Sequence, residues 1–188
     1  MWPWHSGQRV LRMARVHLVG RDASMAMAVS SALDDFCRFN PPLMGPAWAG
    51  VGLVAVRSLN WLMALRMIGD PLRLGADRVV RVLMHLGLIG QVLAEDLAEG
   101  PPRVAPARAL MFLARGLPFI PQAVQWARLG ETSLNQALAA YGQEGPSPTT
   151  SQVGLDAYWA ALCCWLLGKE WAQAGVQPGL ARLIGLGR

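Results

Sequence analysis

The segment from Asn40 to Trp61, NPPLMGPAWAGVGLVAVRSLNW, constrains the fold of this chain more than any other. A proline-rich turn leads into an almost wholly apolar run that carries one arginine, Arg57, and one asparagine, Asn60. The i, i+3 spacing places both side chains on one face of a helix. Because an unpaired polar group is costly in an apolar interior, each needs a partner. We therefore expect a buried helix that faces either a polar cleft or an internal hydrogen-bonding cluster.

The length and composition predict a single folded domain that spans residues 1–188. A chain of 188 residues is long enough for one sizeable core. Hydrophobic residues make up 53% of the chain and charged residues only 15%, which excludes an intrinsically disordered protein.

The mean hydropathy of +0.29 raises the question of a membrane protein. The most apolar stretch, Pro46–Ile68, is interrupted by Arg57, Asn60 and Arg66, so we expect no membrane span. Helices buried on several sides explain the same hydropathy, and a membrane-associated protein is the weaker alternative. The N-terminal arginines precede a run, Ala23–Leu33, that serines dilute, which makes a poor signal peptide. A cytoplasmic and a periplasmic location both stay open.

The charged residues permit an anionic polysaccharide as partner and do not indicate nucleic acid. The net charge is +5, and all basic residues except Lys169 are arginines, which bind carboxylate and sulfate groups in a bidentate manner. High-GC nucleotide composition explains the same arginine content. The basic residues are scattered, with no dense run and no interleaved aromatic strip, so we expect no nucleic-acid partner.

The cysteines and histidines predict no disulfide framework, metal site or cofactor. The three cysteines are Cys37 and the adjacent pair Cys163 and Cys164, an odd number without framework spacing. The three histidines lack cysteine or histidine partners at metal-ligand spacing.

The residues that start and stop secondary structure in this chain are typical of helices throughout. Prolines, glycines and capping residues separate apolar runs, and no sustained alternation of period two indicates a strand. We expect eight or nine helices in an all-α array, over about Gln8–Val19, Ala23–Phe39, Ala47–Ile68, Leu72–Ala98 with a break near Gly87 or Gly90, Ala105–Arg115, Gln122–Leu129, Thr132 or Ser133 to Tyr141, Leu155–Ala174 and Gly179–Ile184. Residues Gly142–Ser151 are expected to form a loop.

Six segments in order resemble the helical toroid of the heparinase II/III family of polysaccharide lyases. They are RVLRMARVHLVGRD, CRFNPPLMGPAW, RSLNWLMAL, VLMHLGLIGQVLAEDL, ARGLPFIPQAVQWARLGETSL and GQEGPSPTTSQVGLDAYWAAL. No single segment is specific, but together they cover nearly the whole chain. The resemblance implies an incomplete (α/α) toroid of antiparallel helical hairpins. In the full-length family a C-terminal β-sandwich packs on this layer, so the resemblance implies a separate β-sandwich as partner.

The same resemblance implies β-elimination on a uronic-acid-containing anionic polysaccharide. This reaction needs neutralisation of the uronate carboxylate, a base for the C5 proton and an acid for the leaving oxygen. In the family, an Asn-His pair and a Tyr of the toroid contribute to this chemistry. Here the pair is missing, because Pro101, Pro102, Arg103 and Val104 stand at its place. The Tyr is kept as Tyr158, but the His that follows it in the family is Trp159.

Each candidate site residue has a functional and a structural interpretation. Tyr158 is the catalytic candidate, as acid or base, or it packs near the start of its helix. Arg57 and Asn60 form a sugar-contacting stripe or an internal hydrogen-bonding cluster. Arg103 is the candidate for neutralising a carboxylate in place of the missing Asn.

Trp48 and His85 complete the candidate substrate-binding residues. Trp48 offers a stacking surface for a sugar ring, or it is a core residue. His85 lies among apolar neighbours on its helix, where a single histidine is more often a core residue than a functional one.

Two functions from different classes follow from the sequence. The first is a heparinase II/III-like lyase module, degenerate or truncated, that acts on or binds uronic-acid polysaccharide. The second is a non-catalytic helical scaffold that pairs with another protein.

Overall fold

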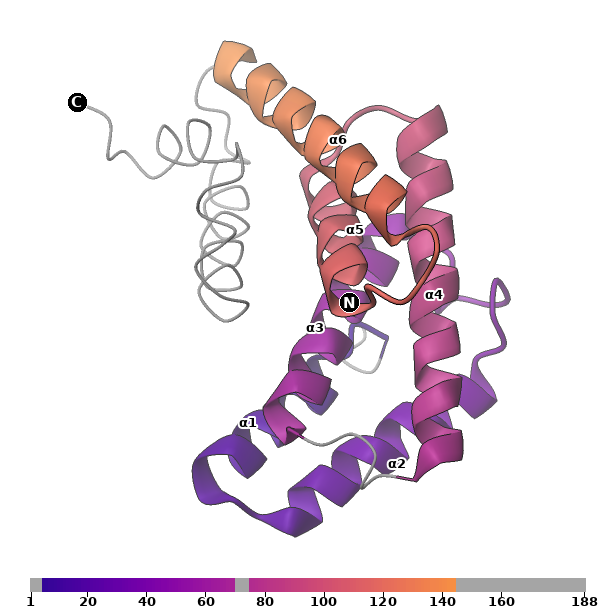
Figure 1. The fold of residues 1–188 in the computed structure, drawn as a ribbon, viewed down its shortest axis with the longest axis vertical. Coiled ribbons are helices and arrows are strands. Elements are labelled where there is room, and N and C mark those ends of the chain that lie inside the picture. Colours follow the sequence, from indigo (N-terminus) through magenta and orange to yellow (C-terminus); the bar gives the residue numbers. More distant parts are fainter. Residues whose placement is uncertain (1–4, 70–74, 145–188) are drawn as a thin grey trace, which may run out of the picture.

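The fold of this protein is all-α in every segment described by the structure, a computed structural model that describes residues 5–69 and 75–144. The all-α prediction is confirmed there, since these segments contain helices and no strand. The helices are α1 (Gln8–Gly20), α2 (Ala23–Phe39), α3 (Val51–Ile68), α4 (Ala76–Glu99), α5 (Val104–Gly116) and α6 (Ala123–Glu144), as Figure 1 shows.

The expected helix over Ala23–Phe39 is confirmed at both ends as α2. At its start, the Asp22 side chain accepts a hydrogen bond of 2.8 Å from the Ser24 amide, which satisfies one of the free donors of the first turn. At its end, the Asn40 amide donates to the Phe36 carbonyl, and Pro41 cannot continue the helix.

The expected start of the apolar helix at Ala47 is wrong, since α3 begins at Val51. Residues 45–49 form tight turns instead, in which the Trp48 amide donates to the Gly45 carbonyl over 3.1 Å. Gly45 has a φ of 73°, and Gly50 is extended with a φ of −140°. These two glycines separate the turn from the helix, so Trp48 lies on the connection between α2 and α3.

Two expected helix breaks are also wrong. The chain continues through Gly87 and Gly90 as α4, and α6 joins the two helices expected on either side of residues 130–132. α6 also runs to Glu144, beyond the expected loop start at Gly142. The reason is packing. A Cβ on Gly130 would lie 2.8 Å from the Ala107 carbonyl oxygen of α5, so this glycine permits a close helix contact rather than a break.

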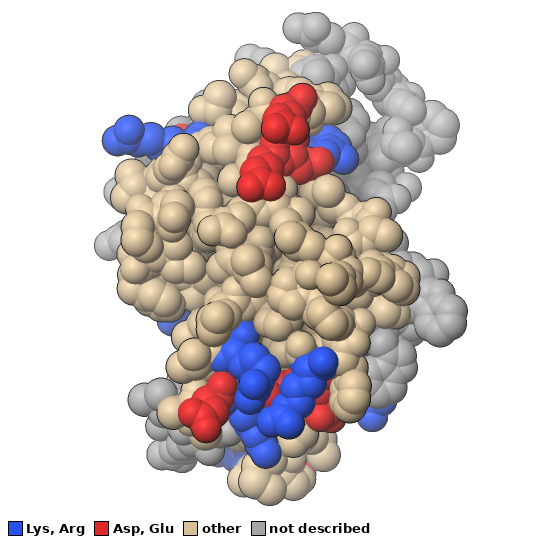
Figure 2. Space-filling model, turned by 90° about the vertical axis from the view of Figure 1, so that its right-hand side faces the viewer, with Lys and Arg blue, Asp and Glu red and all other residues tan. Residues whose placement is uncertain are grey.

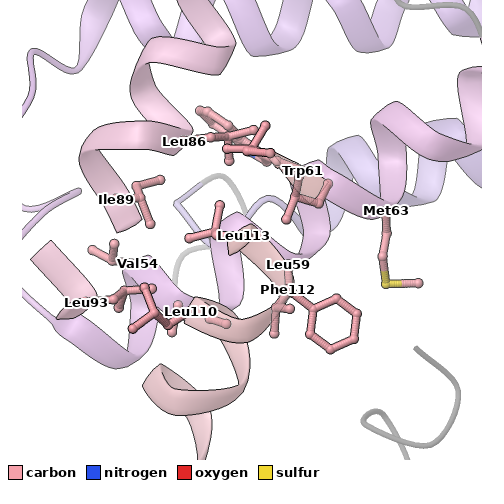
Figure 3. Close-up of a cluster of buried hydrophobic side chains, with 14 of the residues drawn as sticks. Val54, Leu59, Trp61, Met63, Leu86, Ile89, Leu93, Leu110, Phe112 and Leu113 are labelled. Carbon is pink, nitrogen blue, oxygen red and sulfur yellow. The ribbon is translucent and has the colours of Figure 1, made fainter. Parts of the chain in front are cut away.

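α3 is the central helix of the core. It packs against α1, α4 and α5, and α5 packs closely on α6. In Figure 3, Val54 of α3, Ile89 and Leu93 of α4, and Leu110 and Leu113 of α5 point toward one another. Each of these five side chains is at most 1% exposed. Burial on several sides explains why α3 is apolar all round.

Among the described residues, α3 alone combines the length and composition that a membrane span would need. Half of its 18-residue window is buried inside the protein, which is equally typical of a core helix.

The expected helices over Leu155–Ala174 and Gly179–Ile184 lie outside the described residues, as do Tyr158 and the pair Cys163 and Cys164.

Candidate functional site

Arg57 lies fully inside the protein, with 0% of its surface exposed. Its Nη1 donates hydrogen bonds to the carbonyl of Ala47 over 2.6 Å and to that of His5 over 3.4 Å. The guanidinium carbon lies 4.9 Å from the ring centre of Phe36 and 5.0 Å from that of Trp48. Aromatic faces attract a desolvated cation, so these rings offset part of the loss of water around the charge.

Burial lowers the pKa of Arg57 to about 10, and no carboxylate contacts it among the described residues. The side chain therefore stays cationic at neutral pH, and backbone carbonyls and aromatic rings stabilise it. Its Nε and Nη2 atoms form no hydrogen bond within the described part of the chain.

Asn60, one turn after Arg57, holds the segment that leads into α1. Its Nδ2 donates to the Ser6 carbonyl over 2.8 Å, next to the His5 carbonyl that accepts from Arg57. Gly7 follows with a φ of 73°, and a Cβ there would lie 2.9 Å from the Trp61 side chain. The polar stripe of α3 thus fastens residues 5–7 across the helix, which allows α1 to pack on α3.

Trp48 and His85 join Arg57 in one cluster. The rings of Trp48 and His85 are 6.2 Å apart, so the Trp48 ring is near both His85 and the Arg57 guanidinium. His85 is 6% exposed, and its Nδ1 lies 3.2 Å from the Arg81 carbonyl. Burial lowers the pKa of His85, which favours the neutral ring at physiological pH. We define Arg57, Asn60, Trp48 and His85 as the Arg57 cluster.

Arg103 lies apart from the Arg57 cluster. It precedes the first residue of α5, and its Nη2 donates to the Asp96 carboxylate near the end of α4. Asp96 follows His85 by 11 residues on the same helix, which corresponds to about 16 Å along the axis. The structure therefore brings four of the predicted site residues together and leaves Arg103 at the far end of α4, with its side chain 43% exposed.

A second polar cluster, around Asp34, was missed in the sequence. The Asp34 side chain is 7% exposed and accepts from Arg81 at 2.7 Å and from Arg38 at 2.8 Å, with Arg78 at 4.0 Å. Only the i, i+4 pair of Asp34 and Arg38 is visible in the sequence, because Arg78 and Arg81 belong to another helix. Burial alone would raise the pKa of Asp34, but the arginines outweigh it and lower the pKa below its ordinary value.

Replacing Asp34 with asparagine is expected to destabilise the protein by about 1 kcal/mol at neutral pH, because the arginines are partly exposed and water screens them. Because the pKa of Asp34 is lowered in the folded protein, this stabilisation is present when the pH is above the unfolded-state pKa of about 3.9. It is lost as the pH falls through the lower pKa of Asp34 in the folded state. Urea unfolding at neutral and acidic pH measures it. The gap between wild type and Asp34→Asn should close in acid, while the exposed neighbour variant Asp35→Asn should show almost no gap at either pH.

Cys37 is expected to resist alkylation in the folded protein. Burial, with the nearby Asp34 charge, raises the pKa of its thiol to about 12, and the reactive thiolate is scarce at ordinary pH. Iodoacetamide treatment followed by peptide mass spectrometry measures the labelled fraction of Cys37. Native protein should show little label on this residue and urea-unfolded protein should show nearly complete label; equal labelling in both would contradict the buried position.

No group of three or more metal-ligating side chains occurs within residues 5–69 and 75–144. No protein-family model, curated protein or solved structure matches this chain.

Proposed function

We propose that this chain is a non-catalytic helical module of the heparinase II/III type, arranged as an incomplete (α/α) toroid. Six sequence segments in the order of that family support the proposal, together with the all-α character of the described residues. The scaffold role means that the module positions a partner, for which a separate β-sandwich is the form implied by the resemblance.

The position of Arg57 carries the scaffold proposal. A residue that neutralises a substrate carboxylate must reach the substrate, whereas Arg57 is 0% exposed and bonds to backbone carbonyls. Asn60 likewise bonds to the backbone of Ser6. The Asn-His pair expected from the resemblance is replaced by residues 101–104, and none of their side chains can accept a proton at neutral pH. Arg57 and Asn60 therefore serve the fold, and of the residues that the resemblance expects for proton transfer in the toroid, the Asn-His pair is missing while Tyr158 is kept.

A lyase assay tests the absence of catalysis. The purified chain is incubated with alginate, heparin and hyaluronan, and the ultraviolet absorbance of the unsaturated product is followed. We expect no product, with an active polysaccharide lyase as the positive control. Product formation that disappears in Tyr158→Phe would overturn the non-catalytic proposal and establish a β-elimination site at this tyrosine.

Binding of uronic-acid polysaccharide is the second candidate function, and the exposure of Arg103 favours it. The Arg103 side chain is 43% exposed at the start of α5, where cationic groups add to the positive end of the helix dipole. A polysaccharide carboxylate would have to compete with Asp96 for it.

Titration calorimetry with alginate oligosaccharides distinguishes this candidate from a pure scaffold. If Arg103 binds uronate, Arg103→Ala weakens binding about tenfold, which corresponds to one lost charged hydrogen bond of about 1.4 kcal/mol. The control is Arg128→Ala, an exposed arginine on α6. Equal weakening by both variants would indicate unspecific charge attraction, and no binding by the wild type leaves the scaffold as the function.

A further inference from the structure

Positive charge is concentrated on α1. Residues 8–21 contain no acidic residue and four exposed arginines, which are Arg9, Arg12, Arg15 and Arg21. The first carboxylate of the chain, that of Asp22, comes in the turn to α2 and accepts a hydrogen bond from the Ser24 amide. Arg12 and Arg21 form no ion pair with residues 5–69 or 75–144. This helix therefore offers guanidinium groups to an anionic surface.

Apolar side chains lie beside these arginines and are exposed to water. Val16 and Leu18 are each 54% exposed, and Val19 is 88% exposed. The helical repeat of about 3.6 residues places Val16 and Val19 within about 40° of Arg12 around the helix axis. The buried Ala14 lies about 160° away from Arg12, on the side that packs against the core. The outward side of α1 therefore combines cationic and apolar side chains, an arrangement typical of helices that lie on membrane surfaces.

The apolar end of this side lies at an edge of the molecule. Figure 1 shows the turn between α1 and α2 at the lower left, away from α5 and α6. Arg15 precedes Val19 by about 6 Å along the helix axis, and Arg21 follows Val19 in the turn. Arginines therefore flank the apolar side chains on both sides along the chain. Their long stems allow the charged groups to stay in a polar layer while the valines leave water.

We propose that α1 binds the surface of a membrane that contains anionic lipids, with its outward side against the lipid. The α1 face is defined as Arg9, Arg12, Arg15, Val16 and Val19. Lipid phosphates accept hydrogen bonds from arginine, and each basic side chain near an anionic leaflet adds to the attraction. The valines enter the boundary between headgroups and acyl chains, to a depth of about 5–10 Å. The contact is peripheral and needs no membrane span, and it does not depend on the proposed polysaccharide binding.

Two other partners fit the α1 face less well. A second copy of the chain would bring the same arginines against one another, which is unfavourable. A nucleic acid would use the arginines but would leave the valines unused, and α1 contains no phenylalanine, tyrosine or tryptophan that could stack on a base. Of the three, only the lipid surface uses both kinds of side chain.

The side of the molecule that contains α4 has a different distribution of charge. In Figure 2, basic and acidic side chains occur near both ends of this side, and a broad uncharged region separates them. An anionic membrane would be attracted and repelled at the same time on such a surface. The charge distribution therefore favours an orientation in which α1, and not α4, is turned toward the lipid.

We expect this membrane binding to be weak and reversible. The helix α1 has 13 residues and is about 20 Å long, so its contact area is small. A single weak signal gives only marginal membrane binding, so the charge and the apolar contact are both needed. Removal of either one is therefore expected to have a measurable effect.

Cosedimentation of the full chain with lipid vesicles tests the proposal. One set of vesicles contains phosphatidylcholine alone, and the other contains phosphatidylcholine with the anionic lipid phosphatidylglycerol. We expect binding to the anionic vesicles at low salt, a decrease as salt rises because the charges are screened, and almost no binding to the neutral vesicles. A chain that does not bind anionic vesicles at low salt, or that binds both sets equally, would overturn the proposal.

A double variant, Val16→Ser with Val19→Ser, removes the apolar contact without changing the charge. It should weaken binding to the anionic vesicles about tenfold, because two valines no longer leave water on binding. Val80→Ser with Val124→Ser is the matched control, since these valines on α4 and α6 are 54% and 65% exposed. Unchanged binding by the first double variant would assign the α1 face to soluble polyanions, which arginines alone can bind, and the lipid proposal would then be wrong.

Arg12→Gln removes one positive charge from the α1 face. It should weaken binding to the anionic vesicles about fivefold at low salt and less at high salt. The control is Arg128→Gln, which replaces an exposed arginine on α6. Circular dichroism verifies that each variant is folded. Equal effects of Arg12→Gln and Arg128→Gln would indicate unspecific charge attraction and would contradict the assignment to α1.

Discussion

Replacing Arg57 with alanine is expected to destabilise the protein by about 3 kcal/mol. The substitution removes a large side chain from a closed site, and such large-to-small changes cost about 2–5 kcal/mol. It also leaves the Ala47 carbonyl without its hydrogen bond and takes the cation away from Phe36 and Trp48. Release of the desolvated charge offsets part of this cost, which places the expected value in the lower half of that range.

Two further substitutions at Arg57 separate volume from charge. Arg57→Met keeps most of the volume without the charge and should cost about 1 kcal/mol, since hydrophobic replacement of a buried ion is often close to neutral. Arg57→Lys keeps the charge but loses the planar contact with the rings, and should fall between the two. Urea unfolding with constant m-values measures the series.

The surface variant Arg128→Ala is the control, with an expected change within about 0.5 kcal/mol. If Arg57→Ala were as mild as Arg128→Ala, the Arg57 cluster would not support the fold. Such a result would favour the interpretation of Arg57 as a ligand-binding residue over the scaffold proposal.

The sequence predicted the class of fold because capping and breaking residues act locally. Asp22 and Asn40 define α2 through hydrogen bonds to residues within four positions, and a local pattern is enough to place them. Arg57 and Asn60 were also identified as a stripe that needs partners. Their partners could not be predicted, because His5 and Ser6 are 52 and 54 residues away and accept through backbone carbonyls that any residue type provides.

The errors concern glycines whose role is set by another helix. One break was expected near Gly87 or Gly90 and another between Leu129 and Thr132. Gly90 and Gly130 instead each permit a close approach by a residue far along the chain. The Asp34 cluster was missed for the same reason, because Arg81 reaches Asp34 from 47 residues away. Local signals thus predict where helices form, while contacts between helices determine which polar and small residues carry the structure.

Replacing Gly90 with alanine is expected to destabilise the protein by about 1–2 kcal/mol, although alanine is the better helix former. A Cβ at this position would overlap three ring carbons of Trp126, which is itself 3% exposed and has no open space to enter. Overpacking of this kind costs about 1–3 kcal/mol. The gain in helix propensity returns up to about 1 kcal/mol, which leaves a net loss.

Gly87→Ala on the same helix is the matched control, and the opposite sign is expected for it. A Cβ on Gly87 would lie 3.5 Å from the Ile120 side chain, an ordinary van der Waals contact, so the propensity gain should stabilise the protein by about 0.5–1 kcal/mol. Combining Gly90→Ala with Trp126→Leu removes the obstructing ring. The double variant should therefore be more stable than the added effects of Gly90→Ala and Trp126→Leu would predict. Thermal and urea unfolding of Gly87→Ala, Gly90→Ala, Trp126→Leu and the double variant measure these differences. Stabilisation by Gly90→Ala alone would mean that Trp126 does not pack against α4 as described, and that Gly90 is present for a reason other than the close contact of α4 with α6.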